Sequence, residues 1–162
     1  MGVEIERRFL VKSSGWRSRS TGSSVLRQVY LAVTPAAAIR IRLDGEGRAW
    51  LTIKSGSTGI ARAEFEYSIP SEDAETLLEM RTGHLIAKER FIVPAGARRW
   101  EIDVFAGELA PLVIAEIELD DPEESFGRPD WLGAEITEDG RYSNASLALN
   151  GLPADFQCPK ID

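Results

Sequence analysis

The first residues of the chain place two carboxylates and a guanidinium at alternate positions. Residues 1–11 read MGVEIERRFLV, so in an extended strand Glu4, Glu6 and Arg8 share one face, while the opposite face is apolar except for Arg7. Neighbouring carboxylates repel each other unless water, a cation or basic groups offset their charge. The spacing therefore predicts a charged strand face that needs an ionic partner.

The same alternation recurs in the strand-like segments that follow. Together the charged faces carry seven basic residues (Arg8, Arg40, Arg42, Lys54, Arg62, Lys88 and Arg90) and eight acidic ones (Glu4, Glu6, Glu64, Glu66, Glu101, Asp103, Glu116 and Glu118). The polar face of an antiparallel sheet is usually just solvated, and such a face mixes in Ser, Thr and Gln. These faces are nearly all charged and rich in arginine, whose planar guanidinium suits phosphate or carboxylate.

A sheet that closes into a barrel would point all of these side chains into one water-filled lumen. Carboxylates at alternate positions are hard oxygen ligands suited to Mg²⁺ or Mn²⁺, and arginine and lysine on facing strands suit phosphoryl oxygens. Neither the carboxylates nor the basic residues would be stable inside a barrel without groups of opposite charge beside them. The combination predicts a polyanionic phosphate chain with bound divalent metal.

The elements that would position these residues can be read along the chain. After a Ser- and Gly-rich loop at 13–24, strands are predicted over 25–33, 38–44, 48–56 and 61–70, joined by turn-rich spacers. A helix is predicted over 71–83, with Ser71 as its N-cap and Gly83 at its end. Three more strands over 85–93, 98–107 and 111–119 precede a short helix from about Ser143, closed by Gly151 and Pro153. This order predicts one β-dominated α+β domain over residues 1–150 and a tail over 151–162 with no assigned role.

Composition excludes several classes of protein. A chain of 162 residues with a formal net charge of −7 suits one domain and argues against a non-specific nucleic-acid or membrane-surface binder. No apolar run approaches the roughly 18 residues of a membrane span, and the N-terminus has no signal-peptide pattern, so a cytoplasmic location is expected. The lone Cys158 excludes an intramolecular disulfide, and the lone His84 is expected to be a loop histidine.

Short segments distributed in order along the chain resemble the CYTH family, also called triphosphate tunnel metalloenzymes. They read EIERRF, AIRIRL, LTIK, RAEFEY, KERF, EIDVF, AEIEL, and WLGAEIT followed by RYSNASLA, and the resemblance spans about Val3 to Leu149. The family signature Glu-x-Glu-x-Lys here ends in Arg8. This departure keeps the positive charge but brings a bulkier group that does not readily lose a proton.

The resemblance implies an eight-stranded antiparallel closed barrel, a tunnel that binds a triphosphate together with Mg²⁺ or Mn²⁺. Its short C-terminal helix makes the chain most similar to the inorganic triphosphatases of the family, which hydrolyse tripolyphosphate. Matching positions imply metal ligands at Glu4, Glu6, Glu116 and Glu118, with Glu64, Glu66 and Asp103 as supporting carboxylates. They imply triphosphate contacts at Arg8, Arg40, Arg42, Lys54, Arg62, Lys88 and Arg90.

Lys54 and Lys88 are the candidate catalytic residues. A lysine crowded by other cations has its charged form disfavoured, so its pKa drops toward the range of a general base. Either lysine could instead be a plain phosphate contact.

Other readings stay open at this point. The same scaffold could carry a thiamine triphosphatase or an adenylate cyclase, it could be a non-catalytic module that captures a triphosphate, or its inner charges could merely pair with one another. A base-binding site would need an aromatic wall, and Trp50 is the tryptophan to check because it shares a face with Thr52 and Lys54. Apolar outer positions such as Val3, Ile5 and Phe9 need cover from helices or from a second subunit, and a homodimer is expected.

Overall fold

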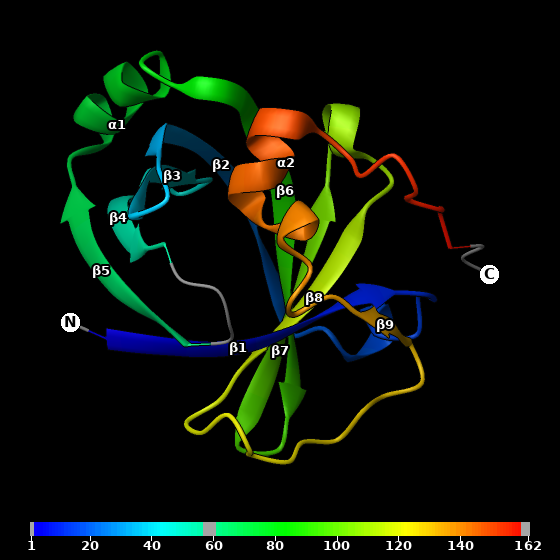
Figure 1. The fold of residues 1–162 in the computed structure, drawn as a ribbon. Coiled ribbons are helices and arrows are strands. Elements are labelled where there is room, and N and C mark those ends of the chain that lie inside the picture. Colours follow the sequence, from blue (N-terminus) through cyan, green and yellow to red (C-terminus); the bar gives the residue numbers. More distant parts are fainter. Residues whose placement is uncertain (1, 57–60, 160–162) are drawn as a thin grey trace.

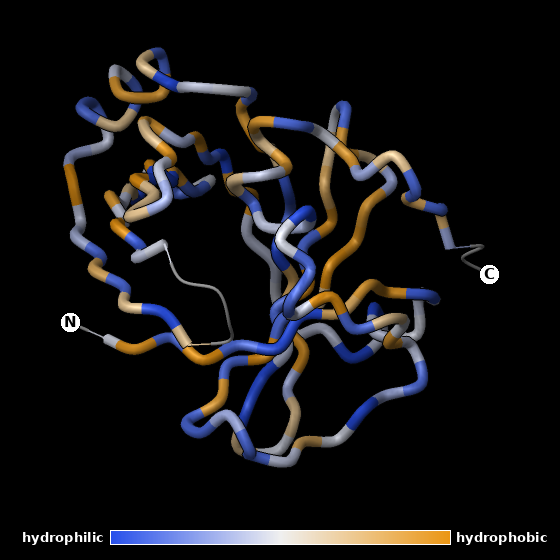
Figure 2. The backbone as a smooth tube through the Cα atoms, viewed as in Figure 1, coloured by the Kyte–Doolittle hydropathy of each residue, from blue (hydrophilic) through white to orange (hydrophobic). Residues whose placement is uncertain are grey.

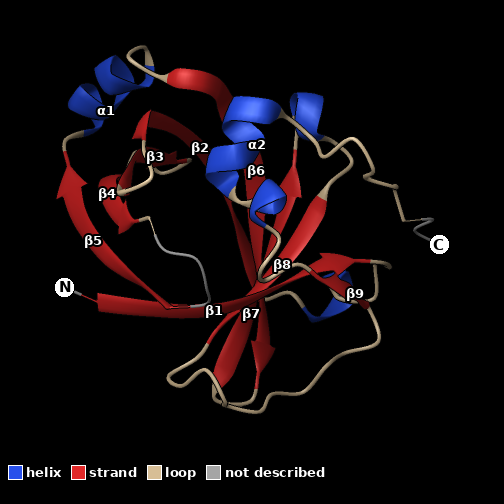
Figure 3. Ribbon diagram, in the orientation of Figure 1, coloured by secondary structure: helices blue, strands red, loops and turns tan. Residues whose placement is uncertain are grey.

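The computed structural model describes residues 2–56 and 61–159, and that part of the chain is dominated by strands (Figure 1). The strands are β1 (Gly2–Val11), β2 (Gly22–Val33), β3 (Ala37–Asp44), β4 (Ala49–Ser55), β5 (Ala61–Ile69), β6 (Thr82–Ala95), β7 (Arg98–Phe105), β8 (Val113–Glu118) and β9 (Leu132–Glu135). The α-helices are α1 (Ser71–Leu78) and α2 (Asn144–Asn150), and short 3-10 helices lie at η1 (Arg17–Arg19), η2 (Gly107–Leu109) and η3 (Gly140–Tyr142). Figure 3 shows how little of the molecule is helical.

Eight of the strands close into a barrel. Neighbours pair antiparallel in the order β5-β4-β3-β2-β6-β7-β8-β1, and β1 pairs again with β5. Strand β1 makes this closure because its first half, from Gly2 to Ile5, pairs with β5, whereas Glu6 to Leu10 pair with β8. Strand β9 pairs with the end of β1 outside the barrel. The predicted eight-stranded closed antiparallel barrel is confirmed.

The alternation in the sequence separates the two faces of the barrel wall. Figure 2 shows hydrophilic and hydrophobic positions alternating along strands such as β5. The outward apolar side chains gather in three buried clusters, each covered by a different part of the chain. Burial of this apolar surface is the main force that holds the wall together, at roughly 25 cal/mol per Å² removed from water.

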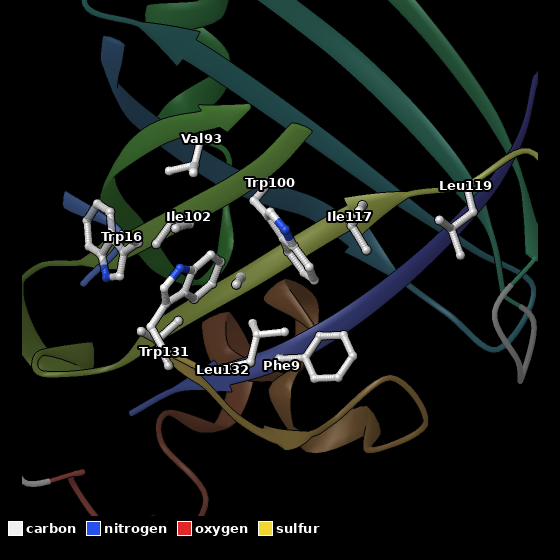
Figure 4. Close-up of a cluster of buried hydrophobic side chains, with 11 residues drawn as sticks. Phe9, Trp16, Val93, Trp100, Ile102, Ile117, Leu119, Trp131 and Leu132 are labelled. Carbon is white, nitrogen blue, oxygen red and sulfur yellow. The ribbon is translucent and has the colours of Figure 1, made fainter. Parts of the chain in front are cut away.

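The largest of these clusters packs the β9 segment against the outside of the barrel. In Figure 4 the rings of Trp100 and Trp131 lie in one cluster with Phe9 and Leu132, and these four residues come from three segments, β1, β7 and the start of β9. Trp100 and Trp131 make an edge-to-face contact with ring centroids 5.4 Å apart, and Trp100 makes another with Phe9 at 5.8 Å. Phe9 therefore obtains its cover within the chain, whereas Val3 stays 63% exposed.

The helices cover the other two clusters. Ala74 and Leu78 of α1 pack on residues of β2, β3 and β4, and Leu147 and Ala148 of α2 pack with Tyr30 and other side chains of β2, β6 and β8. Beyond α2, Leu152 and Phe156 pack against the same cluster as Leu147. None of the helices in the described residues is long and apolar enough to cross a membrane.

The predicted end of the first helix was wrong. Helix α1 ends at Leu78, its N-cap position is Pro70 with Ser71 as the first helical residue, and β6 begins at Thr82. Gly83 therefore lies in β6 at φ +71°, where an added Cβ would lie 2.6 Å from the carbonyl oxygen of Ala148. The glycine allows the β6 backbone to approach α2 closely, and it does not end a helix. His84 lies in the same strand, exposed, and not in a loop.

The other predicted strands and helices are present, although several of their ends differ from the prediction and β9 was not predicted. The Ser- and Gly-rich segment contains one short helical turn, η1, although β2 begins at Gly22, earlier than predicted. Helix α2 begins as predicted, because the Ser143 side chain accepts a hydrogen bond from the backbone N–H of Ser146 and so acts as the N-cap. It ends at Asn150, and Gly151 follows as the C-cap residue with φ 74°.

Candidate functional site: a charged tunnel

The inward faces of the barrel strands enclose a cavity of about 400 Å³, which we call the tunnel. This volume falls in the range of small-molecule sites. Its charged lining consists of Glu4, Glu6, Arg8, Arg40, Arg42, Lys54, Arg62, Glu64, Glu66, Arg90, Arg99, Glu101, Glu116 and Glu118. Ser143, Asn144 and Ala145, where α2 begins, complete part of the wall.

The structure brings most of the predicted site residues together. Every predicted metal ligand and phosphate contact lines the tunnel except Lys88 and Asp103, which are not among the described lining residues. Those two side chains are each 1% exposed, although they lie on the same strand faces as the lining residue Arg90. Lys88 and Asp103 therefore differ from the lining residues in how deeply they are buried and not in the strand face that they occupy.

Basic and acidic side chains alternate around the tunnel wall. Lys54 Nζ donates to Glu4 Oε2 at 2.6 Å, and Arg62 Nη2 donates to Glu6 Oε1 at 3.1 Å. On the facing strands, Arg42 Nη2 donates to Glu66 Oε2 at 3.4 Å. Further ion pairs join Arg40 to Glu64 and Glu66 and Arg90 to Glu101 and Glu116. Each cation therefore already lies beside an anion, in the way a cationic side chain would lie beside a phosphate oxygen.

Arg8, which replaces the signature lysine, is anchored at one end of this wall. Its Nη1 donates to the backbone carbonyl of Tyr142 at 3.1 Å, and its Nε lies 3.8 Å from Glu6 Oε1. Arg7, on the opposite face of β1, pairs instead with Glu135 of β9 on the outside of the barrel. The guanidinium of Arg8 thus links the strand to the segment that leads into α2.

A hydrogen-bonded network joins the lining residue Arg90 to the buried side chains of Asp103 and Lys88. Lys88 Nζ donates to Asp103 Oδ2 at 2.6 Å, and Arg90 Nε donates to Asp103 Oδ1 at 2.7 Å. Burial lowers the pKa of Lys88 to about 8, against the opposing effect of Asp103, and the charge of Arg90 adds to the lowering. Burial acts to raise the pKa of Asp103, but the charges of Arg90 and Lys88 outweigh it and hold that pKa well below its usual range.

Carboxylates crowd one another on β1, β7 and β8. Glu6 lies directly opposite Glu118, and Glu101 directly opposite Glu116, which are like-charge pairs that destabilise a sheet. Burial, followed by the charges of Glu116 and Glu4, raises the pKa of Glu6 to about 7. Burial also acts to raise the pKa of Glu4, but the charge and hydrogen bond of Lys54 leave it below its ordinary value.

This donor set fits a divalent cation in its chemistry. Hard carboxylate oxygens are the ligands that Mg²⁺ and Mn²⁺ prefer. Among the described residues no three His, Cys, Asp or Glu side chains are close enough to hold a metal ion as they are placed. A cation here would therefore share its coordination between one or two carboxylates and oxygens of a bound phosphate chain, as is usual for Mg²⁺.

Sequence reasoning missed Arg99, which lines the tunnel, and two amide residues of the site. Asn144 lines the tunnel, and Gln28 of β2 is 0% exposed and donates to Asn144 Oδ1 at 2.9 Å. The parity of β2 carried a signal for Gln28, because it is a lone amide on the same face as Leu26 and Tyr30. For Asn144 the local sequence gave no signal, because the pattern of a short amphipathic helix does not indicate which part of the barrel the helix packs against.

The aromatic wall that a nucleobase would need does not come from Trp50. Trp50 is not among the described residues that line the tunnel, and the guanidinium groups of Arg42 and Arg48 lie 5.2 and 5.9 Å from its ring centroid. Its ring is therefore engaged by two cations. Trp16, Trp100 and Trp131 are buried in the core.

Comparison with known proteins agrees with this architecture. A protein from Acetivibrio thermocellus named inorganic triphosphatase is 40% identical over 151 residues, covering 93% of this chain and 96% of that protein. Another inorganic triphosphatase, from Nitrosomonas europaea, is 37% identical over 152 residues, covering 91% of this chain and 98% of that protein. The crystal structure of the inorganic triphosphatase NE1496 matches with a TM-score of 0.66 and 34% identity over 93% of this chain and 100% of that one. The CYTH domain model matches residues 2–149, and the chain therefore belongs to the CYTH domain family.

Proposed function

We propose that this protein hydrolyses inorganic triphosphate to diphosphate and phosphate inside the tunnel, with Mg²⁺ or Mn²⁺ as cofactor. The observation that carries the proposal is the arrangement of the tunnel wall, in which arginines and a lysine face carboxylates across a cavity of about 400 Å³. The names of the two relatives at 40% and 37% identity support the same substrate.

The basic residues of the wall would bind the phosphate chain. Arg40, Arg42, Lys54, Arg62 and Arg90 come from strands on different sides of the tunnel, so together they can contact a linear polyanion along its length. As the terminal P–O bond breaks, these cations would neutralise the charge that develops on the leaving diphosphate.

Glu4, Glu6, Glu116 and Glu118 would hold the divalent cation, with Glu64 and Glu66 nearby as supporting carboxylates. When bound, such a cation polarises phosphoryl oxygens and lowers the pKa of coordinated water. Asp103 was also predicted as a supporting carboxylate, but its hydrogen bonds to Lys88 and Arg90 give it a structural role in the present arrangement.

The attacking water must lose a proton to a group that it can reach. Lys54 lines the tunnel, so it can contact substrate once its bond to Glu4 opens, whereas Lys88 is paired with Asp103 and is not among the described lining residues. We therefore assign Lys54 a phosphate contact and place proton removal on the tunnel wall, either at Lys54 or at a carboxylate. The direct contact of Lys88 with phosphate stays a prediction.

The experiment is phosphate release from tripolyphosphate, ATP, thiamine triphosphate and pyrophosphate, each with Mg²⁺, with Mn²⁺ and with a chelator. The variant is the double substitution Glu4→Gln and Glu6→Gln, and the matched control is Glu75→Gln, whose exposed carboxylate pairs with Arg27 outside the tunnel. We expect tripolyphosphate to turn over well above the other substrates, only with metal, and to be lost in the double variant alone. Turnover of thiamine triphosphate or ATP above tripolyphosphate would contradict the proposed substrate, and metal-dependent binding without turnover would indicate a binding module.

The expected partners are also proposals. A small-molecule triphosphate is the expected ligand, nucleic acid and membranes are not expected, and a homodimer is expected because Val3 stays exposed. Sedimentation at micromolar concentration distinguishes a dimer from a monomer.

A further inference from the structure

Asn144 is the first residue of α2 and part of the tunnel wall. Its side-chain oxygen, Oδ1, accepts two hydrogen bonds, one from Gln28 Nε2 at 2.9 Å and one from Lys88 Nζ at 3.1 Å. A lysine ammonium can only donate, so the atom that faces it must be the carboxamide oxygen. The orientation of the Asn144 amide is therefore fixed by the chemistry of its neighbours.

This orientation leaves the amide nitrogen available. With Oδ1 held by Gln28 and Lys88, Nδ2 makes no hydrogen bond to any residue in the described part of the chain. Among the described residues, Asn144 Nδ2 is not one of the buried side-chain atoms that lack a hydrogen-bond partner, so this nitrogen is accessible to solvent. Asn144 also borders the tunnel. A donor that is fixed in direction and has no acceptor of its own is suited to an anionic ligand.

The residues behind Asn144 are placed to hold it rather than to reach the ligand. Gln28 is 0% exposed, and the Lys88 side chain is 1% exposed and bonded to Asp103 as well as to Asn144. Burying an amide and an ammonium is costly unless their hydrogen bonds are made. Asn144 supplies one acceptor to both groups, so it connects the buried network to the tunnel.

We infer that the side-chain nitrogen of Asn144 donates a hydrogen bond to a non-bridging oxygen of the bound triphosphate, with Gln28 and Lys88 as positioning residues that orient it. The inference rests on the proposed function, since it deepens the binding of the same substrate. Asn144 adds a neutral donor on the wall formed by the start of α2, in a tunnel whose other ligand contacts are cationic. It also gives Lys88 a role that does not require the lysine to enter the tunnel.

The test is the affinity for tripolyphosphate, measured by calorimetry without metal and then with Mg²⁺, together with kcat and KM for phosphate release. Asn144→Ala removes the donor without adding charge. Asn144→Asp keeps an acceptor oxygen for Gln28 and Lys88 but replaces the donor by a second oxygen. Two controls accompany them: Asn150→Ala, an exposed asparagine on the same helix that donates to Ser146, and Ala145→Asp, which adds a carboxylate to the wall while Asn144 is kept.

We expect Asn144→Ala to weaken tripolyphosphate binding and to raise KM by about tenfold or more, the effect of losing one hydrogen bond to a charged group, with kcat changed little. Asn144→Asp should weaken tripolyphosphate binding more than Ala145→Asp does. The melting temperature of the ligand-free Asn144→Asp variant should be close to that of the wild type. Asn150→Ala should bind as the wild type does.

Wild-type affinity in a folded Asn144→Ala variant would overturn the inference and leave the proposed function intact. Equal losses in Asn144→Asp and Ala145→Asp would overturn it as well, because charge alone would then explain the effect. If Asn144→Ala does not fold, the comparison of the two aspartate variants decides. Failure of the wild type to bind tripolyphosphate at all would overturn both this inference and the proposed function.

Discussion

Lys88 Nζ and Asp103 Oδ2 lie 2.6 Å apart in a position where both side chains are 1% exposed. Arg90 shares the same carboxylate through two further hydrogen bonds at 2.7 and 2.8 Å. One buried anion therefore holds two cations of β6 against β7. A carboxylate in this position is a structural centre for the tunnel wall, since Arg90 is a lining residue and Lys88 supports Asn144.

Substitution of Asp103 tests that structural role. Asp103→Ala leaves two buried cations without their shared anion, so we expect the free energy of unfolding to fall by about 3–5 kcal/mol. Urea unfolding followed by circular dichroism measures the change. Glu75→Gln, which breaks an exposed pair with Arg27, should leave the urea midpoint unchanged. An Asp103→Ala midpoint equal to that of the wild type would show that the buried pair is not needed for the fold.

The pair between Arg7 and Glu135 gives a pH dependence of stability. The hydrogen bond from Arg7 lowers the pKa of Glu135 to about 2, below its ordinary value of 4.5. A carboxylate whose folded-state pKa is lowered stabilises the fold above the unfolded pKa and loses this contribution as pH falls through the folded pKa. Because the pair is partly exposed, we expect a contribution of about 1 kcal/mol that is present at pH 7 and disappears between about pH 4.5 and 2.

Urea unfolding of the wild type and of Glu135→Gln across that pH range measures this contribution. The two proteins should differ at pH 7 and converge near pH 2. A difference that stays constant with pH would rule out linkage through this carboxylate.

Glu6 tests the predicted metal site without relying on turnover. In the protein without metal, the carboxylate lies opposite Glu118 and is buried, so Glu6→Gln should raise the melting temperature by removing like-charge repulsion. The same variant should lose most of the thermal stabilisation that Mg²⁺ or Mn²⁺ gives the wild type, because a ligand oxygen has lost its charge. Differential scanning calorimetry with metal and with chelator measures both effects, and an undiminished metal-induced shift would exclude Glu6 as a ligand.

Lys54 separates a phosphate contact from a general base. We expect Lys54→Met to raise KM for tripolyphosphate by about tenfold or more, because a charge-assisted hydrogen bond is lost. Lys54→Arg should restore most of the affinity and of kcat, since arginine keeps the charge and the donors. Restored KM with kcat still far below the wild type would instead identify Lys54 as the proton acceptor, because arginine does not readily lose a proton.

Arg8 tests what the departure from the family signature changes. We expect Arg8→Lys to lose either the hydrogen bond to the Tyr142 carbonyl, which is 3.1 Å long, or the ion pair with Glu6. The two contacts use different nitrogens of the guanidinium, whereas a lysine has one charged nitrogen. We expect a loss of about 1 kcal/mol in unfolding free energy with tripolyphosphatase activity retained. Guanidinium unfolding and steady-state kinetics measure the two quantities, and loss of activity at unchanged stability would show that Arg8 acts on the substrate and not on the start of α2.

The sequence by itself determined which side chains share the inner face of the barrel. Strand geometry has a period of two residues, a local property of the backbone, so alternation in β1, β3, β5 and β8 assigned Glu4, Arg40, Glu64 and Glu116 to one face without knowledge of neighbours. The repeated pattern also indicated closure, because only a closed wall gives so many charges a common interior. The predicted end of α1 was wrong because Gly83 does not end a helix. It lies against the backbone of Ala148, a residue far away in the chain, where a side chain would not fit.

Only the tertiary structure decided which residues of that face reach the tunnel and what they contact. Lys54 and Glu4 are brought together because β1 closes the barrel against β5, and Lys88 is withdrawn because Asp103 and Asn144 cover it. Depth of burial and choice of partner depend on the packing of segments distant in sequence, and strand parity carries no information about either. The role inferred for Asn144 follows from the same physical reason, since its amide is oriented by residues of β2 and β6 that lie 116 and 56 positions away.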